Sequence, residues 1–157
     1  MITENNAQLV EELNDLVQIQ NDRIKGYQNA IEDVQEKNTD LRLVFQKMIE
    51  TSETHLMQLS TQISFLGGEV VEGTTMSGKI YRAWMDVKLA VTGPDRENVL
   101  ETCKHGEEAA QKAYDMALAS DAELSTTVRQ MLHVQQRELK SQQNEIIALE
   151  AIADKLD

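Results

Sequence analysis

Residues 67–94 read GGEVVEGTTMSGKIYRAWMDVKLAVTGP, and this stretch decides how the chain is connected. It holds the only proline, the only tryptophan and most of the seven glycines of the 157-residue chain. Outside it, residues that break helices are rare, and Ala, Leu, Gln, Glu and Met are abundant, which favours helix over sheet. We therefore expect residues 67–94 to be a long connection between long helices.

Apolar residues on both sides of this connection recur at three- and four-residue steps, the pattern of a helix face packed on a core. The stripes predict helices at about 3–37, 39–66, 95–119 and 122–156. The breaks within each pair are short and predict two antiparallel hairpins. The connection at 67–94 then crosses over along the bundle and carries a short helix at about 77–91. The whole pattern predicts one all-α domain over residues 1–157, an up-down four-helix bundle with one long crossover, as in ferritin-like bundles.

The expected helix ends carry recognisable signals. Asn38 or Thr39 can cap the second helix, and Asp40 suits its first turn. Gly67 and Gly68 predict its end, because glycine adopts the left-handed conformation at little cost.

Charge and cysteine content exclude several classes of protein. The chain has 27 acidic and 15 basic residues, a formal net charge of −12, which argues against nonspecific nucleic-acid binding. The start of the chain has no basic region or apolar core, and no apolar run approaches the roughly 20 residues of a membrane span. We expect a cytoplasmic protein. The single cysteine, Cys103, excludes an intramolecular disulfide and is expected to be a buried apolar residue.

Several short motifs resemble a known family. They are Leu13-Asn14-Asp15-Leu16, Asn21-Asp22, Gly26-Tyr27, Gly67-Gly68, Ser77-Gly78, Arg82-Ala83-Trp84-Met85, Cys103-Lys104-His105-Gly106-Glu107 and Ala113-Tyr114. Together they resemble bacterial ferritin-like four-helix-bundle proteins of unknown function, degenerate relatives of rubrerythrin and other ferritin-like proteins. The resemblance covers nearly the whole chain and implies the fold much more firmly than a function.

Each predicted helix turns polar near its middle. The residues concerned are Gln20, Ser52, His55, Gly106, Glu107, Gln135 and Glu138. Counting outward from the two hairpin turns places Gln20 level with His55, Arg23 level with Glu53, and Glu107 level with Gln135. We expect Gln20, Ser52 and Gln135 to form a polar layer in the middle of the bundle that fixes helix register.

Di-iron ferritin-like proteins take one Glu from each of two helices and Glu-x-x-His from each of the other two. Here Ser52-x-x-His55 lacks the glutamate, and Gln135-x-x-Glu138 has neither ligand in place. His55 and Glu107 are the candidate metal ligands, with Glu53 and Glu138 as weaker ones. A resident cofactor is not expected, and a weakly held divalent metal is the alternative.

Two functions compete. The first is a non-catalytic ferritin-like bundle that acts through protein association, with stress physiology as its suggested setting. The alternative is a ferritin-like oxidase or iron-handling protein with an atypical iron or manganese ligand set. Trp84 and Met85 are candidate interaction residues, on a segment that either covers the bundle or contacts another chain. The expected partners are a second copy of the chain, giving a dimer, or another protein; nucleic acid and membrane are not expected.

Overall fold

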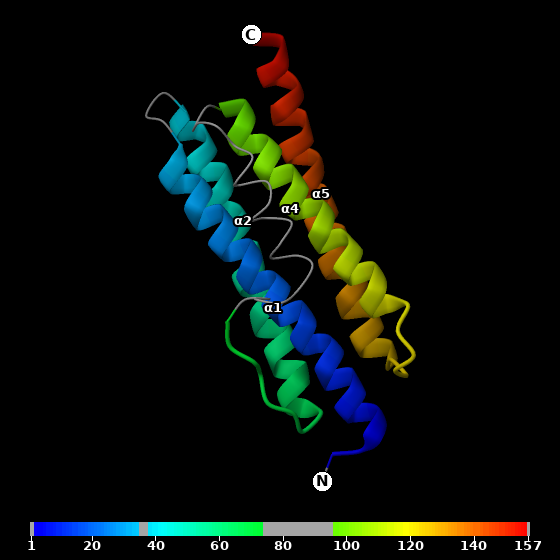
Figure 1. Ribbon diagram of the computed structural model, residues 1–157. Coiled ribbons are helices and arrows are strands. Elements are labelled where there is room, and N and C mark those ends of the chain that lie inside the picture. Colours follow the sequence, from blue (N-terminus) through cyan, green and yellow to red (C-terminus); the bar gives the residue numbers. More distant parts are fainter. Residues whose placement is uncertain (1, 35–37, 74–95, 157) are drawn as a thin grey trace.

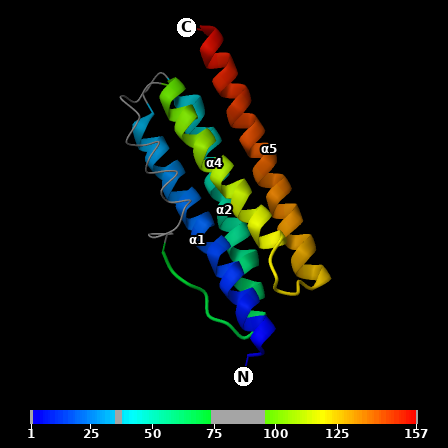
Figure 2. The same ribbon diagram turned by 45° about the vertical axis from the view of Figure 1, so that its right-hand side comes forward.

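The computed structural model describes residues 2–34, 38–73 and 96–156, with side chains as far as residue 152. All regular structure in these residues is helical: α1 (Glu4–Asp33), α2 (Thr39–Phe65), α4 (Arg96–Leu118) and α5 (Thr126–Leu156). The helices lie side by side as an elongated bundle (Figures 1 and 2). The predicted all-α four-helix bundle is confirmed. The short helix predicted at 77–91, with Trp84 and Met85, lies outside the described residues.

The starts of α2 and α4 indicate a long crossover between the two hairpins. The Arg96 guanidinium lies 2.9 Å from Asp40 Oδ2, so α4 begins beside the start of α2, not beside its end. After α2 the chain turns back along α1 (Figures 1 and 2): Asn14 Nδ2 donates to the carbonyl of Glu69 at 2.9 Å. The end of α2 and the start of α4 therefore lie toward opposite ends of the bundle, as expected for helices joined by a long crossover.

The helix ends follow local capping chemistry. Thr3 Oγ1 accepts the backbone N–H of Asn6 at the start of α1. The helix stops at Asp33, before the predicted residue 37, because Val34 has extended backbone angles (φ −70°, ψ 127°). At the end of α2, Gly67 has φ +87°, and the N–H of Gly68 donates to the carbonyl of Ile63, as in a Schellman cap.

The start of α5 also differs from the sequence-based prediction. The helix begins at Thr126 and not at residue 122. Ser125 supplies the reason, because its Oγ accepts the backbone N–H of Val128 and so satisfies a donor of the first turn.

Buried apolar side chains form two clusters, one toward each end of the bundle. The first includes Leu13, Leu16, Leu59, Tyr114 and Leu132, and the second includes Tyr27, Phe45, Met48, Leu100 and Ile146. Between them lies a set of buried polar residues that we call the central polar layer: Gln20, Arg23, Ser52, His55, Glu107, Gln135 and Gln142. The four helices thus bring uncharged and charged polar groups together in the middle of the molecule.

None of the helices in the described residues combines the length and the apolar character needed to cross a membrane.

The approach of the crossover to α1 yields a stability prediction. A Cβ atom added at Gly68 would lie 2.5 Å from Cγ1 of Val10, and a stiff β-branched side chain cannot move aside easily. We expect Gly68→Ala to lower the free energy of unfolding by about 1–3 kcal/mol in urea denaturation. In a Val10→Ala background, which removes Cγ1 and Cγ2 and leaves only the residue 10 Cβ atom at 3.1 Å, the same substitution should cost clearly less. An equal cost in both backgrounds would contradict the close packing.

Candidate functional site: the central polar layer

Arg23 of α1 lies at the centre of the polar layer and contacts the other three helices. Its Nε donates to Glu107 Oε1 of α4 at 2.6 Å. Its Nη1 donates to Ser52 Oγ and to the Met48 carbonyl of α2, at 2.8 and 2.9 Å. Its Nη2 donates to Gln142 Oε1 of α5 at 2.6 Å. One guanidinium therefore ties all four helices together.

The ion pair of Arg23 and Glu107 is excluded from solvent, with side-chain exposures of 1% and 0%. Burial by itself lowers the pKa of Arg23, but the carboxylate of Glu107 raises it, and the net pKa lies above the usual value. Tyr27 donates to the same Glu107 oxygen at 2.7 Å, and its ring lies 5.1 Å from the Arg23 guanidinium carbon. The arginine charge is thus held by a carboxylate and an aromatic face.

A second set of hydrogen bonds extends from Gln20 through the other half of the layer. Gln20 Nε2 donates to the Tyr114 hydroxyl at 2.7 Å, and that hydroxyl donates to Gln135 Oε1 at 2.7 Å. Gln135 Nε2 then donates to Gln58 Oε1 at 2.9 Å. This chain of neutral groups links α1, α4, α5 and α2, and burial raises the pKa of Tyr114, so the phenol stays protonated.

His55 joins the layer to the surface. Gln20 Nε2 donates to its Nδ1 at 3.2 Å, so the ring proton lies on Nε2, which donates to Glu138 Oε2 at 2.8 Å. Burial lowers the pKa of His55 from the ordinary 6.5, and the hydrogen bond to Glu138 opposes this shift only in part. Glu138 is itself half exposed, so this buried imidazole has a partner that reaches solvent.

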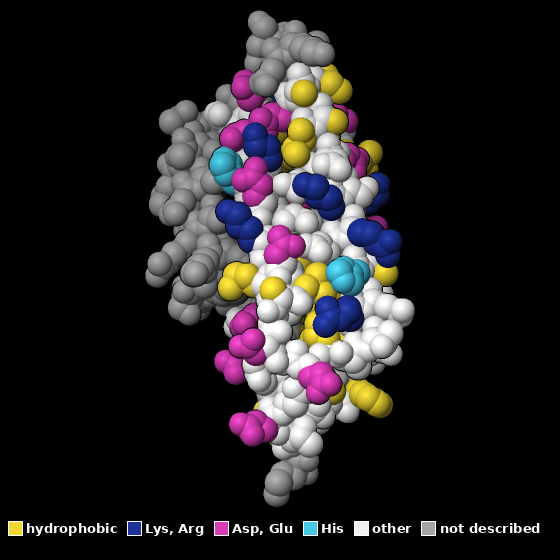
Figure 3. Space-filling model, turned by 90° about the vertical axis from the view of Figure 1, so that its right-hand side faces the viewer, with side chains coloured by type: hydrophobic (Ala, Val, Ile, Leu, Met, Phe, Trp, Pro, Cys, Tyr) yellow, Lys and Arg dark blue, Asp and Glu magenta, His cyan; other side chains and the backbone are white. Residues whose placement is uncertain are grey.

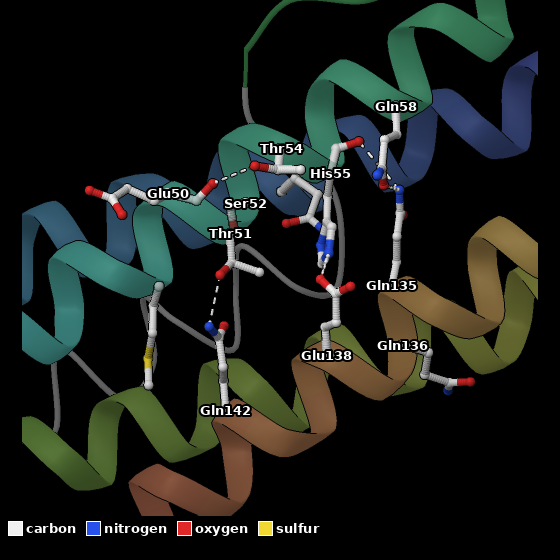
Figure 4. Close-up of polar contacts among 12 residues, drawn as sticks. Glu50, Thr51, Ser52, Thr54, His55, Gln58, Gln135, Gln136, Glu138 and Gln142 are labelled. Carbon is white, nitrogen blue, oxygen red and sulfur yellow. Dashed lines mark hydrogen bonds and ion pairs between the residues drawn. The ribbon is translucent and has the colours of Figure 1, made fainter.

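Polar side chains line the seam between α2 and α5 (Figure 4). Gln142 Nε2 donates to Thr51 Oγ1 at 2.8 Å. One turn along the seam, His55 contacts Glu138. About one further turn along, Gln135 contacts Gln58. Each contact joins one residue of α2 to one of α5. These three polar contacts, which we call the polar rungs of α2 and α5, therefore fix the register of the two helices.

The structure brings most of the residues predicted for this site together. Gln20, Ser52, His55, Glu107 and Gln135 are all buried in the layer, and Gln20 lies level with His55 as expected. Glu138 contacts His55, whereas Glu53 is exposed and takes no part. Cys103 is buried too, and burial raises the pKa of its thiol well above the usual value, with a further rise from the Glu107 charge.

The register predicted for the second hairpin is wrong. Gln135 pairs with Tyr114, and Glu107 lies near Gln142 through their shared partner Arg23. The helices are therefore offset by about two turns from a count that starts at residue 121. The late start of α5 at Thr126 contributes to this offset.

Arg23 is the residue that sequence reasoning missed. Ile24 and Ile31 look like the core positions of α1, yet both are only partly buried, whereas Arg23 and Ala30 are buried. A strict four-three alternation from Leu9 would have found them, because it gives positions 9, 13, 16, 20, 23, 27, 30 and 34. The apolar character of the isoleucines concealed this alternation.

The donor set of the layer does not fit a di-iron centre. Such a centre needs four glutamates and two histidines from the four helices. In the described residues no group of three or more His, Cys, Asp or Glu side chains is placed to hold a metal ion. Within the central polar layer the only carboxylate, that of Glu107, already pairs with the Arg23 cation, and His55 pairs with Glu138. That His55 and Glu107 hold a weak metal ion stays a prediction.

Comparison with known proteins agrees with this fold. Residues 8–120 match the model of a family described as a domain of unknown function, DUF2383. No curated protein matches the chain.

Two solved structures illustrate the likeness. A mutant of Dps1 from Mycobacterium smegmatis has a TM-score of 0.82 and 14% identity, over 96% of this chain and 99% of that one. A structure titled as ferritin-like, diiron-carboxylate proteins from Bacillus anthracis has a TM-score of 0.69 and 17% identity, with the same two coverages. At these identities the likeness establishes a ferritin-like fold.

The buried ion pair yields a prediction on stability. Arg23→Met leaves Glu107 charged and without its counter-ion, so we expect a loss of about 3–5 kcal/mol in the free energy of unfolding. Adding Glu107→Gln removes the stranded charge and should restore a large part of that loss. Urea denaturation of the single and double variants measures the coupling. Additive losses would show that the two side chains do not act as a pair.

The environment of His55 predicts a pH dependence. Its pKa is lower in the folded chain than the ordinary 6.5, so the unfolded chain binds the proton more readily. The free energy of unfolding should therefore decrease as pH falls through 6.5 toward the folded pKa, with a slope of up to about 1.4 kcal/mol per pH unit. His55→Gln should remove this component of the slope. His133→Gln, at an exposed position, is the matched control and should leave the slope unchanged.

Proposed function

The chain belongs to the DUF2383 family, and we propose that it works by protein association, as a non-catalytic ferritin-like bundle that pairs with a second copy of itself. The observation that carries this proposal is the outer surface of the second half of α2. That surface is exposed, partly apolar and free of charge.

Residues 54–68 contain no charged residue, although charged residues make up 27% of the chain. Met57, Thr61 and Phe65 follow one another at four-residue steps and so share one face of α2. Met57 is 72% exposed and Phe65 is 84% exposed. By contrast, the face that carries α5 mixes acidic and basic side chains along much of its length (Figure 3). The uncharged half of α2 is therefore unusual for this surface.

The charge of the chain favours a second copy as the partner. Two copies with a formal charge of −12 each repel one another, and the repulsion is weakest where no carboxylates face the other copy. An uncharged segment with exposed Met57 and Phe65 offers such a place. The two side chains would be removed from water on contact, which favours association.

The alternative, an iron- or manganese-dependent oxidase, has weaker support. It needs Glu107 as a metal ligand, and this carboxylate already has the Arg23 guanidinium 2.6 Å away. Near-stoichiometric iron or manganese in protein purified from iron-supplied cells would favour this alternative, and a Glu107→Gln variant would then have to lose the metal.

Sedimentation velocity over a concentration series tests the pairing. The parent should form a dimer, and more of it at higher salt, because salt screens the repulsion between the acidic copies. Phe65→Glu and Met57→Glu place a charge on the contact and should weaken the dimer by about tenfold or more, since a desolvated unpaired charge is costly.

Met116→Glu is the matched control, because Met116 of α4 is 66% exposed and lies on another helix. It should leave the dimer unchanged. A parent that stays monomeric at every concentration and salt, or a dimer that only Met116→Glu disrupts, would refute the assignment to α2.

A further inference from the structure

The atoms around the Arg23 guanidinium have the character of a cation cage. Its hydrogen-bond acceptors are all oxygens: Glu107 Oε1 and Gln142 Oε1 at 2.6 Å, Ser52 Oγ at 2.8 Å and the Met48 carbonyl at 2.9 Å. They come from α4, α5 and α2, and the arginine enters from α1. One carboxylate, one amide, one hydroxyl and one carbonyl oxygen are ligand types that hard divalent cations such as Mn²⁺ and Ca²⁺ accept.

Glu107 has unused capacity to bind a cation. Its Oε1 accepts from both Arg23 and Tyr27, while its Oε2 is buried and finds no hydrogen-bond partner in the part of the chain that the structure describes. A buried carboxylate oxygen without a partner is costly, and a cation or an ordered water would satisfy it. The cage therefore holds one more oxygen than the guanidinium uses.

The position of the cage is that of a metal centre in a helix bundle. It lies between the two apolar clusters, at the level where Ser52 stands three residues before His55. Ferritin-like di-iron proteins carry Glu-x-x-His motifs facing the bundle core, with the metal ions held among the helices. In this chain the positive charge at that level belongs to a side chain.

We propose that the Arg23 guanidinium is the permanent occupant of a divalent-cation site in the bundle, and that this site binds a metal ion when the guanidinium is removed. Arg23 then balances the charge of Glu107 and joins the four helices, the two tasks that a metal ion performs in such a centre. The same side chain keeps metal ions out of the cage.

Titration of metal-free Arg23→Ala with Mn²⁺ alone tests this proposal. Its melting temperature should rise progressively with Mn²⁺, because an ion that binds only the folded state stabilises it. Electron paramagnetic resonance should show about one Mn²⁺ bound per chain. Ser52→Glu in the same background adds a second carboxylate and should tighten binding.

Two controls tie the effect to the cage. The parent, with its guanidinium in place, should show neither bound Mn²⁺ nor a shift in melting temperature. Adding Glu107→Gln to Arg23→Ala should weaken Mn²⁺ binding by more than the roughly 10- to 100-fold that loss of an outer partner costs.

Three results would overturn the proposal. One is a folded Arg23→Ala variant that Mn²⁺ does not stabilise. Another is Mn²⁺ binding that survives loss of the Glu107 carboxylate. The third is a parent that binds Mn²⁺ as tightly as the variant. If Arg23→Ala is unfolded without metal, Mn²⁺ must restore its helical circular dichroism, and failure to do so is equally decisive.

Discussion

The buried ion pair between Arg23 and Glu107 is the interaction on which the rest of the structure depends. Two opposite charges removed from water stabilise a fold only when their geometry is close and further hydrogen bonds compensate for the water that they lose. Here the separation is 2.6 Å, and α2 and α5 supply further acceptors for the guanidinium. A shift of α1 or α4 by one turn would separate the two charges, and a shift of α2 or α5 would leave guanidinium N–H groups without acceptors. The pair therefore fixes the register of the bundle more strictly than apolar contacts alone.

This constraint explains how the core is divided. Apolar clusters tolerate rearrangement if their volume is kept, whereas a hydrogen-bonded layer accepts only one arrangement. The layer lies between the two clusters and continues to the surface along the polar rungs of α2 and α5, where His55 meets Glu138. The apolar clusters supply most of the burial, and the layer selects the alignment in which that burial occurs.

The sequence predicts much of this arrangement, and the features that it does not predict have identifiable physical reasons. The four helices and the long crossover follow from periodicity and from the position of glycine and proline, and the polar interruptions at Gln20, Ser52 and His55 follow from the stripes. The role of Arg23 does not follow from the sequence, because a charged residue is normally assigned to the surface. In addition, Ile24 and Ile31 complete a more continuous apolar stripe on α1. The alignment of Glu107 with Gln142 could not be predicted either. It depends on where α5 begins and on how the helices are offset, and a count from the turn supplies neither.

Glu107 and Arg23 also show how this bundle balances the charge of a carboxylate that is buried in its middle. A ferritin-like bundle needs positive charge in its middle wherever a carboxylate is buried there, and either a bound ion or a side chain can provide it. A side chain provides it in every folded molecule, whatever metal the surroundings contain. With Arg23 as the proposed occupant of the cation site, the bundle would be stable without a bound metal ion. The uncharged second half of α2, on an otherwise acidic chain, is the surface that the proposed pairing of two copies would use.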